Sequence, residues 1–286
     1  MPNISYSQLS VFENCPKQYK LRYVDKLSKN VSNIHLIFGS AMHTVIQSWL
    51  DVIYNKTATA ADKMDLNTML KDELISEFLK AQEKDEQAPC TKDQINEFFD
   101  DGVAILDFLK RRRGDYFAKK QWSLVGCEIP INVKIRDKIR LIGFLDVVLR
   151  HSSGRIKILD LKTSTMGWNK YVKADKLKAA QLLLYKMFYA EQKFVAPEDI
   201  DIEFFILKRR LYEKADFPQK RIQKFVPANG SVSLNRARKM LDNFVTLTFD
   251  KDGKYMVENL KATPSKKSCK FCEFLDTEDC KDGIKS

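Results

Sequence analysis

Proline and glycine are scarce in this chain, with 8 and 10 copies among 286 residues. Average use is about 5% for proline and 7% for glycine, so collagen-like repeats and low-complexity disorder are excluded. Long hydrophobic runs are also missing: no stretch approaches the ~18 uninterrupted apolar residues of a membrane span. The six cysteines are too few for a disulfide-dense miniprotein. We therefore expect a folded globular protein that does not cross a membrane.

The first residues also lack the features of a secretory leader. Residues 1–5, MPNIS, contain neither a basic region nor an apolar region. We expect a cytoplasmic protein, or one in the host cytoplasm if the chain is viral. In that reducing compartment the cysteines are expected to be free thiols or metal ligands rather than disulfides.

Positive charge dominates, but it is unevenly distributed. The chain has 49 Lys and Arg against 38 Asp and Glu, a formal net charge of +11. Residues 51–120 hold 12 of the former and 15 of the latter, so the remaining residues have a net charge of +14. A basic surface attracts phosphate backbones. The charge favours a nucleic-acid partner, with a merely basic soluble protein as the alternative.

The spacing of apolar residues predicts an α/β fold. A helical period begins at residues 39–43, which open the first amphipathic helix, and continues through a helical block at 51–120. Period-two alternation and short apolar runs then predict strands, and helical periods return later. The expected strands are 125–135, 139–149, 156–161, 202–208 and 221–226; the later helices are 177–193 and one capped by Ser233. This order predicts a mixed central sheet flanked by helices.

Two acidic residues stand out because they end or interrupt apolar strands. Asp146 closes the run 141–146, and a charge buried there needs a cation or a hydrogen-bonded partner. Asp160 and Lys162 are two residues apart on the next strand and so project from one sheet face. Taken alone, this spacing is also explained by an ion pair at a strand end.

The flanking residues resemble the core of the PD-(D/E)XK nuclease superfamily. The matching segments are Gly143-Phe144-Leu145-Asp146 and, after a 14-residue step, Asp160-Leu161-Lys162-Thr163-Ser164. The resemblance implies a restriction-endonuclease-like core with a helical insertion. It implies three catalytic residues, of which Asp146 and Asp160 hold Mg²⁺ or Mn²⁺ and Lys162 lies beside the attacking water. Hard oxygen ligands suit these ions, and a metal-bound water is a better nucleophile.

Further segments resemble the RecB-like branch of that superfamily. They are Gly39-Ser40-Ala41-Met42-His43, the Gln181-x-x-x-Tyr185 pair, and the N-terminal Ile4–Leu9 and Cys15–Tyr19. The resemblance implies that His43 and the Leu161 backbone carbonyl complete the metal site. It also implies that Gln181 and Tyr185 contact the substrate. We expect Glu128 only as a supporting carboxylate behind the ligands.

The cysteines near the C-terminus are spaced like metal ligands. Cys269, Cys272 and Cys280 form a C-x2-C-x7-C pattern, which leaves one of four ligand positions to be filled elsewhere. Iron–sulfur members of the RecB-like branch have one cysteine before the first helix and three after the core. The resemblance implies that Cys15 completes a [4Fe–4S] cluster; structural zinc on the same four thiolates is the alternative. Of the remaining cysteines, Cys127 is expected to be a buried hydrophobe and Cys90 has no assigned role.

Together these features predict a metal-dependent DNA exonuclease acting on single-stranded DNA or DNA ends. Repair, recombination, phage replication and CRISPR adaptation are the candidate pathways. The alternative is a DNA-binding subunit with a weak or unused nuclease site; any unwinding needs a helicase partner, since no Walker-type loop is present. Basic residues at 208–224 and the aromatic side chains of Trp168, Tyr171 and Tyr212 are further candidates for DNA contacts. The predicted segments are 1–50 (cluster ligand and first core helix), 51–120 (helical insertion), 121–260 (nuclease core) and 261–286 (iron–sulfur cysteines).

Overall fold

A mixed β-sheet forms the centre of the molecule. The computed structural model describes residues 2–27, 32–83, 88–212 and 214–285. Its six strands are β1 (Asn3–Ile4), β2 (Trp122–Arg136), β3 (Ile139–His151), β4 (Ile156–Ser164), β5 (Ile200–Lys208) and β6 (Ile222–Phe225). The order is β1-β3-β4-β5-β6, with β2 also paired to β3; β1–β3 and β4–β5 are parallel and the other pairs antiparallel. The predicted α/β fold with a mixed sheet is confirmed.

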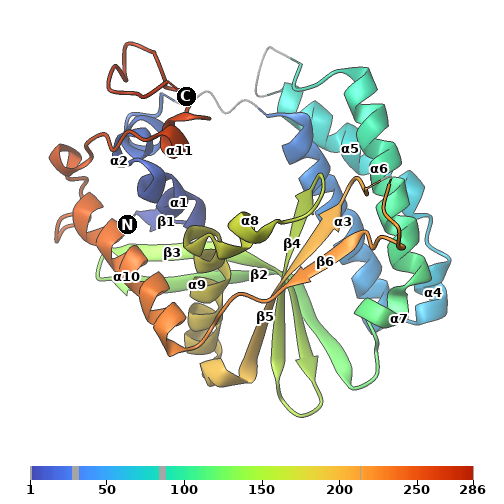
Figure 1. The fold of residues 1–286 in the computed structure, drawn as a ribbon. Coiled ribbons are helices and arrows are strands. Elements are labelled where there is room, and N and C mark those ends of the chain that lie inside the picture. The colour runs from blue at the N-terminus through green and yellow to red at the C-terminus, as the bar shows by residue number, and fades with distance from the viewer. Residues whose placement is uncertain (1, 28–31, 84–87, 213, 286) are drawn as a thin grey trace.

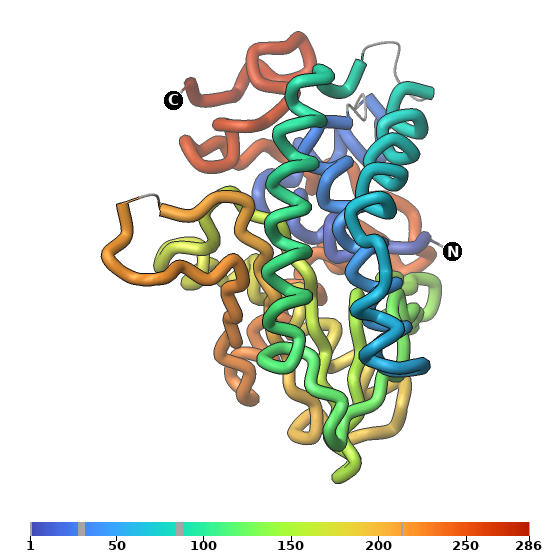
Figure 2. Tube along the Cα trace, turned by 90° about the vertical axis from the view of Figure 1, so that its right-hand side faces the viewer, coloured from blue at the N-terminus to red at the C-terminus, as the bar shows by residue number. Residues whose placement is uncertain are grey.

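Helices cover both faces of this sheet (Figure 1). On one side lie α3 (Ile34–Asn55), α4 (Ala58–Asp62), α5 (Leu66–Gln82), α6 (Lys92–Arg111) and α7 (Arg113–Tyr116). On the other lie α1 (Tyr6–Asn14), α2 (Pro16–Tyr19), η1 (Lys20–Val24), α8 (Lys170–Ala174), α9 (Lys176–Lys193), α10 (Ser231–Thr248) and α11 (Lys266–Cys269). Figure 2 shows α5 and α6 running alongside each other in front of α3. Two short 3₁₀ turns are η2 (Pro197–Asp199) and η3 (Val257–Asn259).

Two hydrophobic clusters hold these layers together, one on each face of the sheet. Val147, Leu149, Leu159 and Leu161 pack toward α3 and the helical block. The opposite face, which includes Ile158, packs against α1, α9 and α10. Apolar burial is the main favourable term in folding, so α3 and the helices at 58–116 form an integral layer over the sheet.

Two predicted helix starts are wrong. The first long helix begins at Ile34, several residues before Gly39, because the Asn33 side chain accepts hydrogen bonds from the backbone N–H groups of His35 and Leu36 at 3.0 and 3.2 Å. That is an ordinary N-cap. Helix α10 starts at Ser231 with Gly230 at the N-cap, so Ser233 is not the cap.

Helix α3 is the one described helix that is long and apolar enough to cross a membrane. Half of its most apolar window is buried inside the protein, where it packs on the sheet. Residues such as Trp49 and Ile46 at the centre of this helix are fully buried. Its hydropathy is therefore that of a core helix.

The two ends of the chain lie against each other, with α11 next to α1 and α2 (Figure 1). We call residues 261–285 the cysteine segment. Lys17 Nζ lies 2.9 Å from Asp282 Oδ2, and Arg22 Nη2 lies 2.5 Å from Glu273 Oε1. Gln18 Nε2 also donates to Glu273 at 3.1 Å. These contacts clip the cysteine segment onto the N-terminal helices.

Candidate active site

The candidate site lies where β3 and β4 separate. Their antiparallel ladder runs from the Arg150–Ile156 pair to the Val147–Leu159 pair and stops there. One more pair would set Asp146 directly opposite Asp160, and like charges in such a pair are destabilising. Beyond the gap, the same edge of β3 pairs with β1 only at residues 140–141. Residues 142–146 therefore have no strand partner on this edge among the described residues.

Side chains satisfy the backbone groups that this gap exposes on β4. The Leu161 N–H donates to Asp146 Oδ2 at 2.7 Å. The Leu161 carbonyl lies 2.9 Å from His43 Nε2, and His43 Nδ1 lies 3.8 Å from Asp146 Oδ2. The N–H and the C=O of one strand residue point toward the same neighbouring strand, so both backbone groups of Leu161 face the gap between β4 and β3. The structure thus brings together three sequence-predicted ligands: His43, Asp146 and the Leu161 carbonyl.

Asp160 and Lys162 form a tight ion pair beside this group, with the carboxylate buried and the lysine half-buried. Lys162 Nζ lies 2.5 Å from Asp160 Oδ2, and the Asp160 side chain is only 4% exposed. Among the described residues, no hydrogen bond of good geometry reaches Asp160 Oδ2, so its contact with Lys162 is ionic. Burial lowers the pKa of Lys162, but the charges of Asp160 and Asp146 outweigh burial and raise it. Lys162 is therefore a cation at neutral pH.

Glu128 joins the group more closely than the sequence indicates. One ligand atom each from His43, Glu128 and Asp146 lie within 4.8 Å of one another. The backbone of Glu128 is left-handed, with φ of 50°, which is uncommon for a residue that is not glycine. The alternation of side chains between the two faces of the sheet is also broken on β3 beside Asp146. Leu145 and Val147 are two residues apart, yet Leu145 packs on one face of the sheet and Val147 on the other. These irregularities turn the carboxylate of Glu128 toward the site.

Gln47 is a site residue that sequence reasoning missed. Its Nε2 donates to Glu128 Oε1 at 2.6 Å and to the Asp146 backbone carbonyl at 3.1 Å. It follows His43 by four residues on α3, so both side chains lie on one helix face. That spacing is the signal that would have identified it. Gln47 links α3 to β2 and β3 at the site.

The electrostatics of the group favour an added cation. Burial, together with the nearby charge of Asp160, raises the pKa of Asp146 to about 8. Burial and the charge of Lys162 lower the pKa of His43, so its imidazole is neutral at pH 7. A neutral imidazole and clustered carboxylates can coordinate a metal ion.

The donor set fits Mg²⁺ or Mn²⁺. Carboxylate and carbonyl oxygens with one imidazole are the ligands these ions accept. His43 Nε2 is within hydrogen-bonding distance of the Leu161 carbonyl, which leaves Nδ1, 3.8 Å from Asp146 Oδ2, as the ring nitrogen that could bind the metal. His43, Asp146, Asp160, Glu128 and the Leu161 carbonyl are the residues that could hold the metal.

Tyr185 and Gln181 border the site from α9. A Cβ added to Gly143 on β3 would lie 3.0 Å from both Cε1 and Oη of Tyr185, so the ring lies directly on the glycine. Burial raises the pKa of Tyr185, while a hydrogen bond with Gln181 opposes that rise. The predicted pair is thus joined, with the Tyr185 hydroxyl close to the gap in the sheet.

The four cysteines of the predicted cluster lie where the cysteine segment packs on the N-terminal helices. Cys15, Cys269, Cys272 and Cys280 line one small cavity, and all are free thiols. The backbone N–H of Ile284 lies 3.5 Å from Cys269 Sγ and lowers the pKa of that thiol. Elsewhere, Cys127 is half-buried against the α3 side of the core, and half-buried Cys90 packs on the same cluster.

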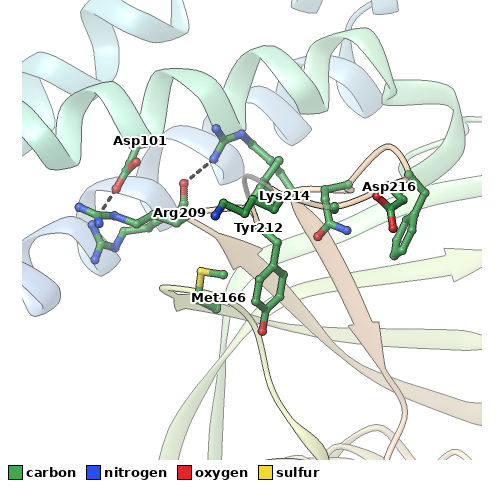
Figure 3. Close-up of a pocket in the computed structure, with 12 residues that line it drawn as sticks. Asp101, Met166, Arg209, Tyr212, Lys214 and Asp216 are labelled. Atoms are coloured by element: carbon green, nitrogen blue, oxygen red, sulfur yellow. Dashed lines mark hydrogen bonds and ion pairs between the residues drawn. The ribbon is translucent and has the colours of Figure 1, made fainter.

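A second, open hollow of about 1020 Å³ lies beside the loop between β5 and β6 (Figure 3). Its most buried cation is already paired: Arg209 Nη1 lies 2.7 Å from Asp101 Oδ2, and the guanidinium stacks 3.6 Å from the Phe98 ring. Arg210 pairs with Glu97 in the same way. Arg209 and Arg210, which were predicted to contact phosphates, instead join the end of β5 to α6.

The other predicted DNA contacts differ in exposure. Tyr171 and Tyr212 are 74% and 66% exposed, whereas Trp168 is half-buried against Phe204 and Phe225. Lys110-Arg111-Arg112-Arg113 is a further basic run, at the end of α6; Lys110 donates to the Met64 carbonyl and Arg113 pairs with Asp62 within the helical block. Lys110 and Arg113 therefore hold the helices of this block together.

Comparisons with known proteins identify the family of the chain. The crystal structure of SSO0001 is 11% identical and aligns over 95% of this chain and 83% of SSO0001, with a TM-score of 0.39. No curated protein is matched by the chain. The family model of the PD-(D/E)XK nuclease superfamily matches residues 3–277, nearly the whole chain, with the Asp146 and Asp160-x-Lys162 elements inside it. The chain therefore belongs to the PD-(D/E)XK nuclease superfamily.

Proposed function

We propose that this protein is a Mg²⁺- or Mn²⁺-dependent exonuclease that hydrolyses phosphodiester bonds of DNA. The observation that carries the proposal is the convergence of His43, Asp146 and the Leu161 carbonyl beside the Asp160–Lys162 pair. Membership of the superfamily supports metal-dependent nuclease activity. The exonuclease mode rests on the RecB-like placement of His43 and of the Gln181–Tyr185 pair.

When bound, the metal would supply a more acidic water and offset charge on the phosphate. The protein's own residues prepare the rest of the site. Lys162 is cationic, so its Nζ donates a hydrogen bond to the attacking water or to a phosphate oxygen rather than accepting a proton. Asp160 holds that ammonium group in place, and Gln47 holds Glu128. Tyr185 is directed by Gly143 and Gln181 toward the same gap.

End-labelled and circular single-stranded DNA test this function. With Mn²⁺ or Mg²⁺, the wild type is expected to degrade linear DNA from one end and to leave the circle intact, because an exonuclease needs an end. Asp160→Asn is the matched inactive variant: the amide keeps the shape of the side chain but lacks its charge. No cleavage by the wild type with either metal would leave the DNA-binding subunit as the function. Cutting of the circle would instead show an endonuclease.

We also infer that the four cysteines hold a [4Fe–4S] cluster that ties the two ends of the chain together. The support for this inference is that Cys15, Cys269, Cys272 and Cys280 line one small cavity although they come from the two ends of the chain. Their order, with one cysteine before the first helix and three after the core, resembles that of the iron–sulfur members of the RecB-like branch. The Lys17–Asp282 and Arg22–Glu273 ion pairs join the same two parts of the chain.

Metal analysis after anaerobic purification tests the cluster. We expect a brown protein with iron and acid-labile sulfide in about equal amounts, and loss of both in Cys272→Ser. Cys127→Ser is the matched control, because that thiol lies on the sheet away from the cavity. Zinc without iron in the wild type would contradict the inference.

A further inference from the structure

A cavity of about 570 Å³ opens directly beside the candidate site. Its wall includes Lys162 and Thr163 from the end of β4, and Gln181 from α9. The remaining lining residues come from α1, the loop before α8, the start of α9 and the cysteine segment: Tyr6, Ser10, Asn14, Trp168, Asp175, Leu177, Lys178, Lys267, Lys270 and Phe271. We call this cavity the groove. It connects the cysteine segment to the candidate catalytic lysine.

The charge of the groove suits a polyanion. Four lysines line it, against the single carboxylate of Asp175. That carboxylate is already engaged: it caps α9 by accepting from the N–H groups of Leu177 and Lys178, and it lies 3.2 Å from Lys267 Nζ. Lys178 and Lys270 have no ion pair with a described residue, so both are available to phosphates.

Aromatic rings accompany these two lysines. Lys178 Nζ lies 5.8 Å from the centre of the Trp168 ring, and Lys270 Nζ lies 5.2 Å from the centre of the Phe271 ring. Phe271 is 86% exposed, although an apolar ring on the surface gains nothing from folding. Trp168 is fixed by its contacts with Phe204 and Phe225. The α8–α9 region and the cysteine segment thus each present one cation and one ring to the groove.

Rings beside cations are suited to unpaired bases. Alternating positive charge and aromatic faces is how proteins bind single strands without sequence preference, because every base has a face that stacks. In a duplex the base faces are covered by their neighbours and cannot stack on a protein ring. The volume of the groove lies within the ~300–1,000 Å³ of typical ligand pockets. A cavity of that size holds a few unpaired nucleotides more readily than a duplex.

From these observations we propose that the groove binds single-stranded DNA next to the candidate site, and that Lys270 and Phe271 of the cysteine segment contact the strand directly. The proposal rests on the proposed nuclease function for the identity of the strand. It gives the cysteine segment a role in binding substrate as well as in holding the chain ends. Lys178 and Trp168 form the facing contact, and Lys162 lies where the strand meets the metal ligands.

Equilibrium binding tests the groove separately from cleavage. Fluorescence anisotropy of a labelled oligothymidylate is measured in EDTA, where no metal-dependent cleavage occurs. Phe271→Ala should weaken binding about 5- to 150-fold, the loss expected for one stacked base. Lys178→Ala, on the other wall and outside the cysteine segment, should weaken binding and reduce the slope of log K against log salt by about 0.7.

The chain offers a matched control. Lys193-Phe194 is a second exposed Lys-Phe pair at the far end of α9, about 27 Å from the groove end of that helix at 1.5 Å per residue. The double variant K193A/F194A should bind as the wild type does, whereas K270A/F271A should not. Iron content and thermal unfolding of K270A/F271A show whether the cysteine segment is intact.

The outcomes separate the two proposals. If the wild type cleaves DNA but Lys178→Ala and Phe271→Ala both bind normally, the groove is wrong and the nuclease function stands. If the wild type binds single strands through these residues but cleaves nothing, the nuclease function is wrong and the groove stands. Binding of duplex DNA or of single-stranded RNA more tightly than single-stranded DNA would overturn the assignment of the strand.

Discussion

Replacing Gly143 with alanine should destabilise the protein and displace Tyr185. The new Cβ would lie 3.0 Å from Cε1 and Oη of Tyr185 and 3.3 Å from its Cζ, closer than the ordinary contact distance of 3.4 Å or more. Tyr185 is only 7% exposed and belongs to the core between the sheet and α9. The ring cannot swing into solvent, so it must shift by a few tenths of an ångström inside a packed interior.

Two opposing effects set the size of the change. Alanine restricts the unfolded chain and is better than glycine within a strand by about 0.5–1 kcal/mol. Overpacking of a filled core costs about 1–3 kcal/mol. The clash on Tyr185 involves two ring atoms and the hydroxyl, so overpacking wins, and we expect a net loss of about 1–2 kcal/mol. DNA cleavage should fall further than the stability loss explains, because Tyr185 borders the site.

Urea denaturation followed by circular dichroism measures the change in unfolding free energy. Gly114→Ala in α7 is the matched control, because a Cβ there meets nothing within 4 Å. It should be neutral or stabilising by about 0.4–1 kcal/mol. Combining Gly143→Ala with Tyr185→Phe removes the contact with Oη and should recover part of the loss, a coupling that only neighbouring residues show.

One result would refute this reasoning: Gly143→Ala as stable as Gly114→Ala, with the same cost in the presence and absence of the Tyr185 hydroxyl. The ring would then not lie against the glycine as the structure places it. A loss of stability without coupling to Tyr185 would trace the effect to the strand rather than to the side-chain contact.

Three other substitutions test further parts of the structure. Above pH 8, Asp146→Asn should raise the melting temperature of the metal-free protein, because the amide still accepts from Leu161 N–H without the buried charge that Asp146 carries above its pKa of about 8. At any pH it should abolish the rise in melting temperature that Mn²⁺ produces in a thermal-shift assay. Burial lowers the pKa of Lys186 below 10.5, so near that pH the unfolded chain binds more protons than the folded protein does. The wild type should therefore become more stable relative to Lys186→Met as pH rises toward 10.5, which urea titrations at several pH values measure as the difference between the two unfolding free energies. Arg209→Ala leaves Asp101 without its partner and should cost about 3 kcal/mol by denaturation, with a smaller loss in the R209M/D101N double variant.

The sheet and its chemistry were largely predictable from local patterns. Period-two alternation before Asp146, the apolar runs around it and the Asp160-x-Lys162 spacing are properties of short segments, and strands express them directly. The start of α3 was predicted wrongly at Gly39, although a local signal was present: Asn33 is an N-cap residue before an apolar stripe.

Other features of the site depend on contacts between distant segments. The left-handed backbone of Glu128 has no local sequence signal, since neither glycine nor asparagine is present there. Its approach to His43 and its hydrogen bond from Gln47 need α3 to pack across β2, 81 residues away in sequence. The end of the β3–β4 ladder likewise follows from the pairing register, which places Asp146 and Asp160 opposite each other. Register is a property of two strands together and cannot be read from either one alone.

The clip between the chain ends has a consequence for how the protein is made. Tyr6 of the groove hydrogen-bonds to the Leu177 carbonyl, 171 residues later, and Lys17 pairs with Asp282, 265 residues later. Lys267, Lys270 and Phe271, which form one wall of the proposed groove, are translated after the candidate metal ligands. A nascent chain on the ribosome, close to messenger RNA and to other nucleic acids, therefore has its metal ligands before it has its complete groove. If the proposed groove binds the strand, translation order delays that binding until the residues up to Phe271 have been made.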